Sequence, residues 1–150
     1  MKELGFDSVG VLAHIILKCV SFGYSIDLTK GQKLLYCCYG VALALKDTRI
    51  CKEHPKAWQY GPAFPRAYKH HKDNRIDFSS DPIATCGDPE LIRDIDDTIK
   101  FYGKYNASSL VNWTHKEDGP WAISSQKGTV LYNDIPDELI KEYFKTFVSA

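Results

Sequence analysis

The segment LTKGQKLLYCCYGVALALK, Leu28–Lys46, decides the fold of this chain. Its apolar residues recur at helical spacing and form one broad stripe: Leu34, Leu35, Cys38, Tyr39, Val41, Ala42 and Leu45. Asp27, just before it, is a residue type that commonly caps a helix N-terminus. A stripe of this width predicts a helix that is buried on more than half of its circumference, so we expect it to be the central element.

Further helix signals lie on both sides of this segment. We expect helices over 9–22, from Pro65 through His71, over 89–102, from Asn106 or Ser108 through Trp113, from Pro120, and from 135 through 147. The clearest start is Asp88-Pro89-Glu90, which supplies a cap, a rigid first position and an acid near the positive end of the helix dipole.

Residues 48–58 show no helical stripe, and Pro55 interrupts them. We expect extended chain there, with two short strands in a hairpin and a turn at Gly61-Pro62. The sequence therefore predicts a mainly α fold: a compact helical bundle of about six to seven helices, with a short β-hairpin or extended excursion around residues 48–60. We predict a single domain over residues 1–150.

Length and composition exclude several classes of protein. The 150 residues are 44% apolar, which is enough for a core, and Lys plus Arg equals Asp plus Glu at 19 each. A chain with a net charge of zero has no overall positive field of the kind that nucleic-acid binders use. It also has little charge repulsion between copies, so a homo-oligomer is possible. Five cysteines, an odd number, indicate reduced thiols and a cytoplasmic protein. The longest apolar run is too short to cross a bilayer, so we expect no membrane partner.

No motif predicts catalysis or a cofactor. Cys51 and His54 have the spacing of half a zinc site, and His70-His71 could add ligands, but no C-x2-C motif is present. Nucleophile-elbow and phosphate-loop motifs are also missing from the sequence. We therefore predict no catalytic residue, no metal and no cofactor. A zinc or Cys/His-dependent enzyme that uses Cys51, His54 or His115 is the weaker alternative.

The run RAYKHHKDNR, residues 66–75, is the one basic stretch that could contact phosphates. Asp73 lies within it and Asp77 follows, whereas phosphate-binding patches need several cations without interruption. We interpret the run as a solvated helix face and loop, and we expect no nucleic-acid partner.

The stretch AWQYGPAFP, residues 57–65, combines three aromatic side chains, two prolines and a glycine. Rigid aromatic loops of this kind are typical of protein-binding hot spots, because little conformational entropy is lost on binding. Burial of Trp58 as an anchor to the core is the competing interpretation.

Several motifs carry a family resemblance. AWQYGP at 57–62 is followed by Pro65 and Tyr68, and QKLLY at 32–36 precedes it. Leu110, Thr114 and His115 then lead to Gly119-Pro120-Trp121. In this order, and over about residues 10–147, the chain resembles the Panacea domain family, which is also called SocA-like or phage GepA-like.

The resemblance implies an antitoxin that neutralises a cognate toxin by binding it, with delivery of the toxin to a host protease as a further mode. It implies no enzymatic activity. The residues expected to bind the partner or to carry the family motif are Trp58, Tyr60, Gly61, Pro62, Pro65, Tyr68, His115, Pro120 and Trp121. The helix motif consists of Gln32, Lys33, Leu34, Leu35 and Tyr36.

Two alternatives stay open at this point. The motif residues could build only the scaffold, with His115 and Trp121 in the core and the toxin-facing surface on residues 69–81. The chain could also be a phage or mobile-element accessory protein that inhibits a host factor, because such a protein would use the same contact chemistry.

Overall fold

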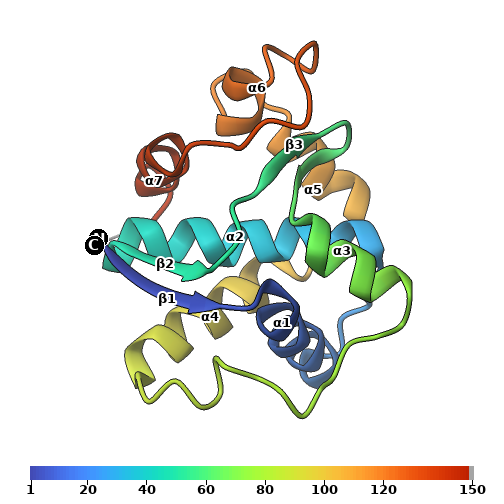
Figure 1. Ribbon diagram of the computed structural model, residues 1–150, viewed down its shortest axis with the longest axis vertical. Coiled ribbons are helices and arrows are strands. Elements are labelled where there is room, and N and C mark those ends of the chain that lie inside the picture. The colour runs from blue at the N-terminus through green and yellow to red at the C-terminus, as the bar shows by residue number, and fades with distance from the viewer. Residues whose placement is uncertain (149–150) are drawn as a thin grey trace.

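Helix α2 (Leu28–Lys46) runs through the centre of the computed structural model, which describes residues 1–148 (Figure 1). The Asp27 carboxylate caps it by accepting a hydrogen bond of 2.8 Å from the backbone N–H of Lys30. Every residue from Lys30 to Leu43 is buried, which confirms the predicted central element.

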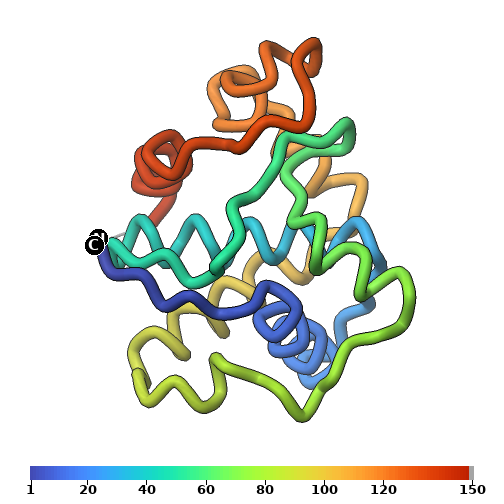
Figure 2. The backbone as a smooth tube through the Cα atoms, in the orientation of Figure 1, coloured from blue at the N-terminus to red at the C-terminus, as the bar shows by residue number. Residues whose placement is uncertain are grey.

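The other helices surround α2. They are α1 (Ser8–Phe22), α3 (Pro65–Lys72), α4 (Pro89–Tyr102), α5 (Ala107–Thr114), α6 (Pro120–Ser124) and α7 (Asp137–Lys145). In Figure 1, α6 and α7 lie on one side of α2, and α1 and α4 lie on the other. A long connection, residues 73–88, links α3 to α4 along the edge of the molecule (Figure 2). With seven helices among residues 1–148, the prediction of a mainly α fold is confirmed.

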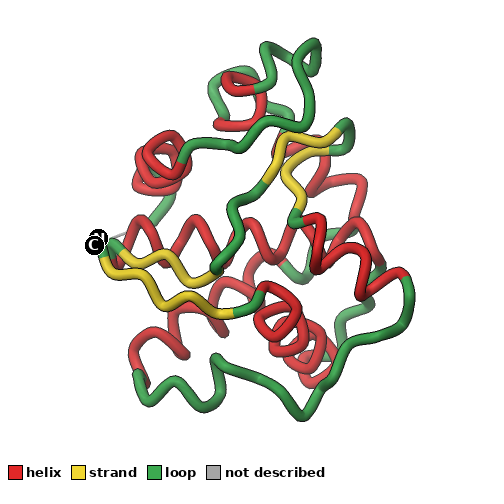
Figure 3. Tube along the Cα trace, in the orientation of Figure 1, coloured by secondary structure: helices red, strands yellow, loops and turns green. Residues whose placement is uncertain are grey.

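Two small β-ladders complete the fold (Figure 3). Strand β1 (Lys2–Phe6) pairs in parallel with β2 (Thr48–Cys51). Strand β3 (Lys56–Trp58) pairs antiparallel with β4 (Gly61–Ala63), and Trp58 faces Gly61 in the register.

These ladders correct the sequence prediction for residues 48–60. The hairpin spans residues 56–63, and its turn is Gln59-Tyr60, whereas Gly61-Pro62 lies in strand β4. Residues 48–51 instead pair with β1, a strand that the sequence did not predict. A parallel pair joins segments far apart in the chain, so no local pattern indicates it.

One hydrophobic core joins α2 to the helices around it. Helix α7 packs against α2 at Gly40, where a Cβ atom would lie 2.3 Å from the ring of Phe144. A glycine is required there because any side chain would overlap the buried ring.

A buried histidine fastens α1 to its neighbours. His14 is 3% exposed, and its Nδ1 lies 2.8 Å from the carboxylate of Asp81 in the long loop. Its Nε2 lies 2.7 Å from the carboxylate of Asp96 on α4. Since both ring nitrogens face carboxylates, the imidazole holds the loop and α4 against α1.

Candidate functional site

The hairpin β3–β4 is held on α2 by two polar side chains of the helix motif. The Lys33 ammonium donates a hydrogen bond of 2.9 Å to the carbonyl oxygen of Pro62. Gln32 Oε1 accepts a hydrogen bond of 2.7 Å from the backbone N–H of Phe64. The structure therefore joins two motifs, 32–36 and 57–65, that are separated in sequence. The remaining helix-motif residues, Leu34, Leu35 and Tyr36, lie in the core.

Trp121 supports the hairpin from the other side. It is 5% exposed, and its indole N–H donates a hydrogen bond of 2.7 Å to the carbonyl oxygen of Trp58. The ring of His115 stacks on Trp121 with centroids 4.0 Å apart. Burial lowers the pKa of His115, and the nearby Lys33 charge adds to this effect, so the imidazole is neutral at pH 7. Pro120 lies in the first turn of α6 and is buried.

Gly61 meets a steric requirement in this arrangement. Its φ is +109°, and a Cβ atom would lie 2.6 Å from Thr114 Oγ1 and 2.8 Å from Lys33 Cε. Glycine is therefore needed both for the backbone conformation and for the close approach of the hairpin to α2 and α5.

The outward side of the hairpin presents aromatic rings. Tyr60, at the turn, is 65% exposed, and Tyr132, on the adjacent chain segment, is 69% exposed. The half-buried rings of Trp58 and Tyr68 pack together with centroids 5.3 Å apart. Pro65 begins α3 and thereby positions Tyr68 one turn later. Of the predicted aromatic residues, Tyr60 is therefore exposed, Trp58 and Tyr68 are half-buried beside it, and Trp121 belongs to the buried support.

These rings surround a pocket of about 260 Å³ between the hairpin and α2, which we call the Lys33 pocket. Its lining consists of Leu28, Thr29, Gln32, Lys33, Trp58, Gln59, Tyr60, Gly61, Ala63, Tyr68 and Tyr132. Gln32 and Lys33 are each 3% exposed and belong to its floor, whereas Tyr60 and Tyr132 belong to its rim. Burial lowers the pKa of Lys33 from 10.5 to about 8.

Tyr132 is the functional-site residue that sequence reasoning missed. It reaches the pocket because its backbone N–H donates to the carbonyl oxygen of Ala57 at 2.7 Å, which lays residues 132–134 along β3. No local signal near Tyr132 indicates this contact, because it depends on pairing between distant segments.

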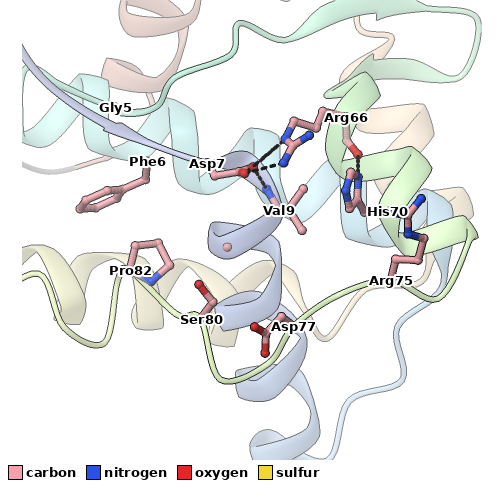
Figure 4. A pocket seen from close by; sticks show the side chains of 11 residues that line it. Gly5, Phe6, Asp7, Val9, Arg66, His70, Arg75, Asp77, Ser80 and Pro82 are labelled. Atoms are coloured by element: carbon pink, nitrogen blue, oxygen red, sulfur yellow. Dashed lines mark hydrogen bonds and ion pairs between the residues drawn. The ribbon is translucent and has the colours of Figure 1, made fainter.

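A second cavity, of about 450 Å³, lies beside the start of α1 (Figure 4). Arg66, His70 and Arg75 from the basic run line it together with Asp7 and Asp77. The Arg66 guanidinium contacts the Asp7 carboxylate at 2.8–3.2 Å, and the same carboxylate caps α1 at Val9. Hydrogen bonding from Arg66 lowers the pKa of Asp7. Because Arg66 and Asp7 compensate each other's charge, neither is free to pair with a ligand.

The residues considered for a zinc or thiol site lie apart. Cys51 is buried in the core, His54 accepts a hydrogen bond of 2.7 Å from Arg49, and His70 donates to the Arg66 carbonyl. Residues 1–148 contain no group of three or more His, Cys, Asp or Glu that could hold a metal ion. His115, the other residue of the enzyme alternative, stacks on Trp121 and lies near the Lys33 charge. The carboxylate of Glu53 lies elsewhere, where it accepts a hydrogen bond from the backbone N–H of Ser8.

Within the same described residues, no helix combines the length and the apolar character that crossing a membrane requires.

Comparisons with known proteins give two matches. The family model described as "Antitoxin SocA-like, Panacea domain" matches residues 32–122, which include the helix motif, the hairpin and Trp121. The protein "Antitoxin SocA" of Caulobacter vibrioides (strain NA1000 / CB15N) is 28% identical over 151 residues, with 89% of this chain and 80% of that protein covered. No solved structure matches the chain.

Proposed function

Because the chain belongs to the antitoxin SocA-like, Panacea domain family, we propose that it is an antitoxin that neutralises a cognate toxin by direct protein–protein binding. The observation that carries this proposal is the exposed aromatic surface of the hairpin, formed by Tyr60 and Tyr132 with Trp58 and Tyr68 beside them. Tyrosine and tryptophan are the residue types that most often dominate the affinity of protein interfaces.

The support beneath this surface favours a binding role. Lys33 and Trp121 hydrogen-bond the hairpin backbone, and Gln32 bonds Phe64 directly after it, so the backbone that carries Trp58 and Tyr60 is held in place. A rigid surface loses little conformational entropy when a partner binds, and more of the contact energy contributes to affinity. The buried motif residues therefore act as the scaffold in this proposal, and the exposed aromatic residues contact the toxin.

The test is co-expression with the toxin encoded by the neighbouring gene. Tyr60→Ala removes an exposed ring and is expected to leave the fold intact, whereas loss of a hot-spot residue should weaken toxin binding at least about ten-fold. Tyr105→Ala, which removes an exposed ring in the turn between α4 and α5, is the matched control. Growth rescue and the affinity of the purified pair are the two readouts.

The long loop offers the competing toxin-facing surface. Phe78, in that loop, is 44% exposed, so Phe78→Ala tests it by the same assay. Loss of neutralisation in Phe78→Ala, with full neutralisation by Tyr60→Ala, would move the interface to residues 69–81 and refute the hairpin surface.

Neutralisation can proceed by sequestration of the toxin in the cytoplasm or by delivery of the toxin to a host protease. Delivery predicts that the antitoxin shortens the half-life of the toxin in cells. A pulse-chase measurement of toxin lifetime with and without the antitoxin separates the two modes. Formation of a homo-oligomer and the single-domain organisation of residues 1–150 stay predictions.

A further inference from the structure

The Lys33 pocket contains a buried positive charge without a counter-ion. Lys33 is 3% exposed, and the Pro62 carbonyl is the one hydrogen-bond acceptor of its three N–H groups. No carboxylate of residues 1–148 lies within ion-pair distance of its Nζ. A buried ammonium is costly unless an anion compensates it, so the site is electrostatically incomplete as it stands.

A second donor in the same pocket is also unsatisfied. Gln32 Oε1 accepts from the backbone N–H of Phe64, which fixes the orientation of the amide and turns its NH₂ group away from that partner. Gln32 Nε2 is buried and has no hydrogen-bond partner. Buried polar atoms of this kind are rare in native proteins and commonly await a ligand or water.

The walls above these two donors are aromatic. Trp58, Tyr60, Tyr68 and Tyr132 all line the pocket, and Tyr60 and Tyr132 leave its rim open to solvent. An aliphatic stem would pack against such rings, while a charged end would reach the donors below them.

We propose that the Lys33 pocket binds a carboxylate, presented by an acidic side chain of the partner protein, with Lys33 and Gln32 donating to its two oxygens. The identity of that partner as a toxin rests on the proposed function, but the carboxylate chemistry rests on the pocket alone. A glutamate or aspartate carries the required pair of acceptors on a short aliphatic stem.

The pKa of Lys33 adds a pH dependence to this binding. The pKa of Lys33 in the free protein is about 8, so the amine is mostly protonated at pH 7 and mostly neutral at pH 9. The other titratable groups around Lys33 are Cys37 on α2, His115 after α5, and Tyr60, Tyr68 and Tyr132 in the pocket lining. Since the carboxylate needs the ammonium form of Lys33, its affinity should be about 10-fold lower at pH 9 than at pH 7.

The experiment uses the purified protein and small probes, without any toxin. N-acetyl-glutamate N-methylamide is titrated against ¹⁵N-labelled protein, and N-acetyl-glutamine N-methylamide serves as the uncharged probe of the same shape. The resonances followed are the side-chain amide of Gln32 and the indole N–H of Trp58. We expect the acidic probe to shift both resonances and to bind at least about 10-fold more tightly than the uncharged probe.

Two variants locate the charge that is responsible. Lys33→Met should abolish the preference for the acidic probe, whereas Lys69→Met removes an exposed ammonium from nearby α3 and should preserve it. If Lys33→Met does not fold, the comparison of the two probes and the pH series in the unmodified protein decide the question.

Three results would overturn the proposal: equal binding of both probes, an affinity that does not fall between pH 7 and pH 9, or loss of the preference in Lys69→Met. Tighter binding of N-acetyl-alanine, which offers only a main-chain carboxylate, would overturn the assignment to an acidic side chain. Failure in these titrations leaves the antitoxin proposal standing, and failure of toxin neutralisation leaves the pocket chemistry standing.

Discussion

Replacing Lys33 by methionine should change how the stability of the protein depends on pH. Methionine retains most of the length of the lysine stem but carries no charge. The substitution also removes the hydrogen bond to the Pro62 carbonyl, which is expected to cost about 1–3 kcal/mol at every pH. This constant cost is separate from the titration that the experiment measures.

The size of the pH-dependent change in the free energy of unfolding follows from the pKa values of Lys33 in the folded and unfolded states. In the unfolded chain the pKa has its ordinary value of 10.5, and in the folded protein burial lowers it to about 8. Below pH 8 both states hold the proton, and the folded state bears the full cost of the buried charge. Between pH 8 and pH 10.5 only the unfolded state still holds the proton, so stability rises with pH. The full gain is about 3 kcal/mol, of which roughly 2–3 kcal/mol falls between pH 7 and pH 10.

Urea unfolding at pH 7 and pH 10 measures this gain. Other groups titrate in the same range; burial raises the pKa of the Cys37 and Cys38 thiols, for example, which weakens the fold as pH rises. Cys37 and His115 feel the Lys33 charge, so they are part of its effect, whereas the other groups are common to both proteins and cancel in the difference between wild type and Lys33→Met. Lys69→Met controls for the loss of one exposed positive charge.

The expected result is that wild type gains about 2–3 kcal/mol relative to Lys33→Met between pH 7 and pH 10. Parallel pH profiles for the two proteins would refute the reasoning, because they would mean that Lys33 is equally solvated in the folded and unfolded states.

Two further substitutions test the packing. Gly40→Ala should lower the free energy of unfolding by about 1–3 kcal/mol because the added methyl group overlaps Phe144. Gly31→Ala, in the same helix, is the control: its methyl group meets its nearest neighbour at 3.3 Å, so the free energy of unfolding should change by less than about 1 kcal/mol. Equal stability of the two variants in urea unfolding would contradict the close approach of α7. Trp121→Phe should lower the free energy of unfolding by about 1 kcal/mol, because the Trp58 carbonyl oxygen loses its hydrogen-bond donor. An unchanged urea midpoint would argue against that hydrogen bond.

Helices could be predicted from the sequence because their signals are local. Asp27 and Asp88 each cap the helix that follows, and the apolar spacing within those helices needs no knowledge of the rest of the chain. Strand β1 could not be predicted, because its five residues pair with β2 after two intervening helices. The hairpin was predicted too early in the chain for the same reason. Residues Thr48–Cys51 are extended because they pair with β1, and not because they form a hairpin with the residues that follow them.

The candidate site was only partly visible in the sequence. The aromatic residues of AWQYGP stand out by composition, and Gln32 and Lys33 belong to a motif that the family resemblance carries. However, a lysine on a helix ordinarily reaches solvent, so its burial under the hairpin requires the three-dimensional structure. Tyr132 lies at the pocket because its backbone pairs with Ala57, and the sequence around Tyr132 contains no pattern that predicts this pairing.

The contact between Gly40 and Phe144 bears on how the protein is made. During translation α2 emerges from the ribosome long before α7, so the apolar surface around Gly40 stays uncovered while most of the chain is synthesised. A chain interrupted before α7 would keep that surface exposed and would be a ready substrate for chaperones and quality-control proteases. Docking of α7 thus covers the apolar surface around Gly40.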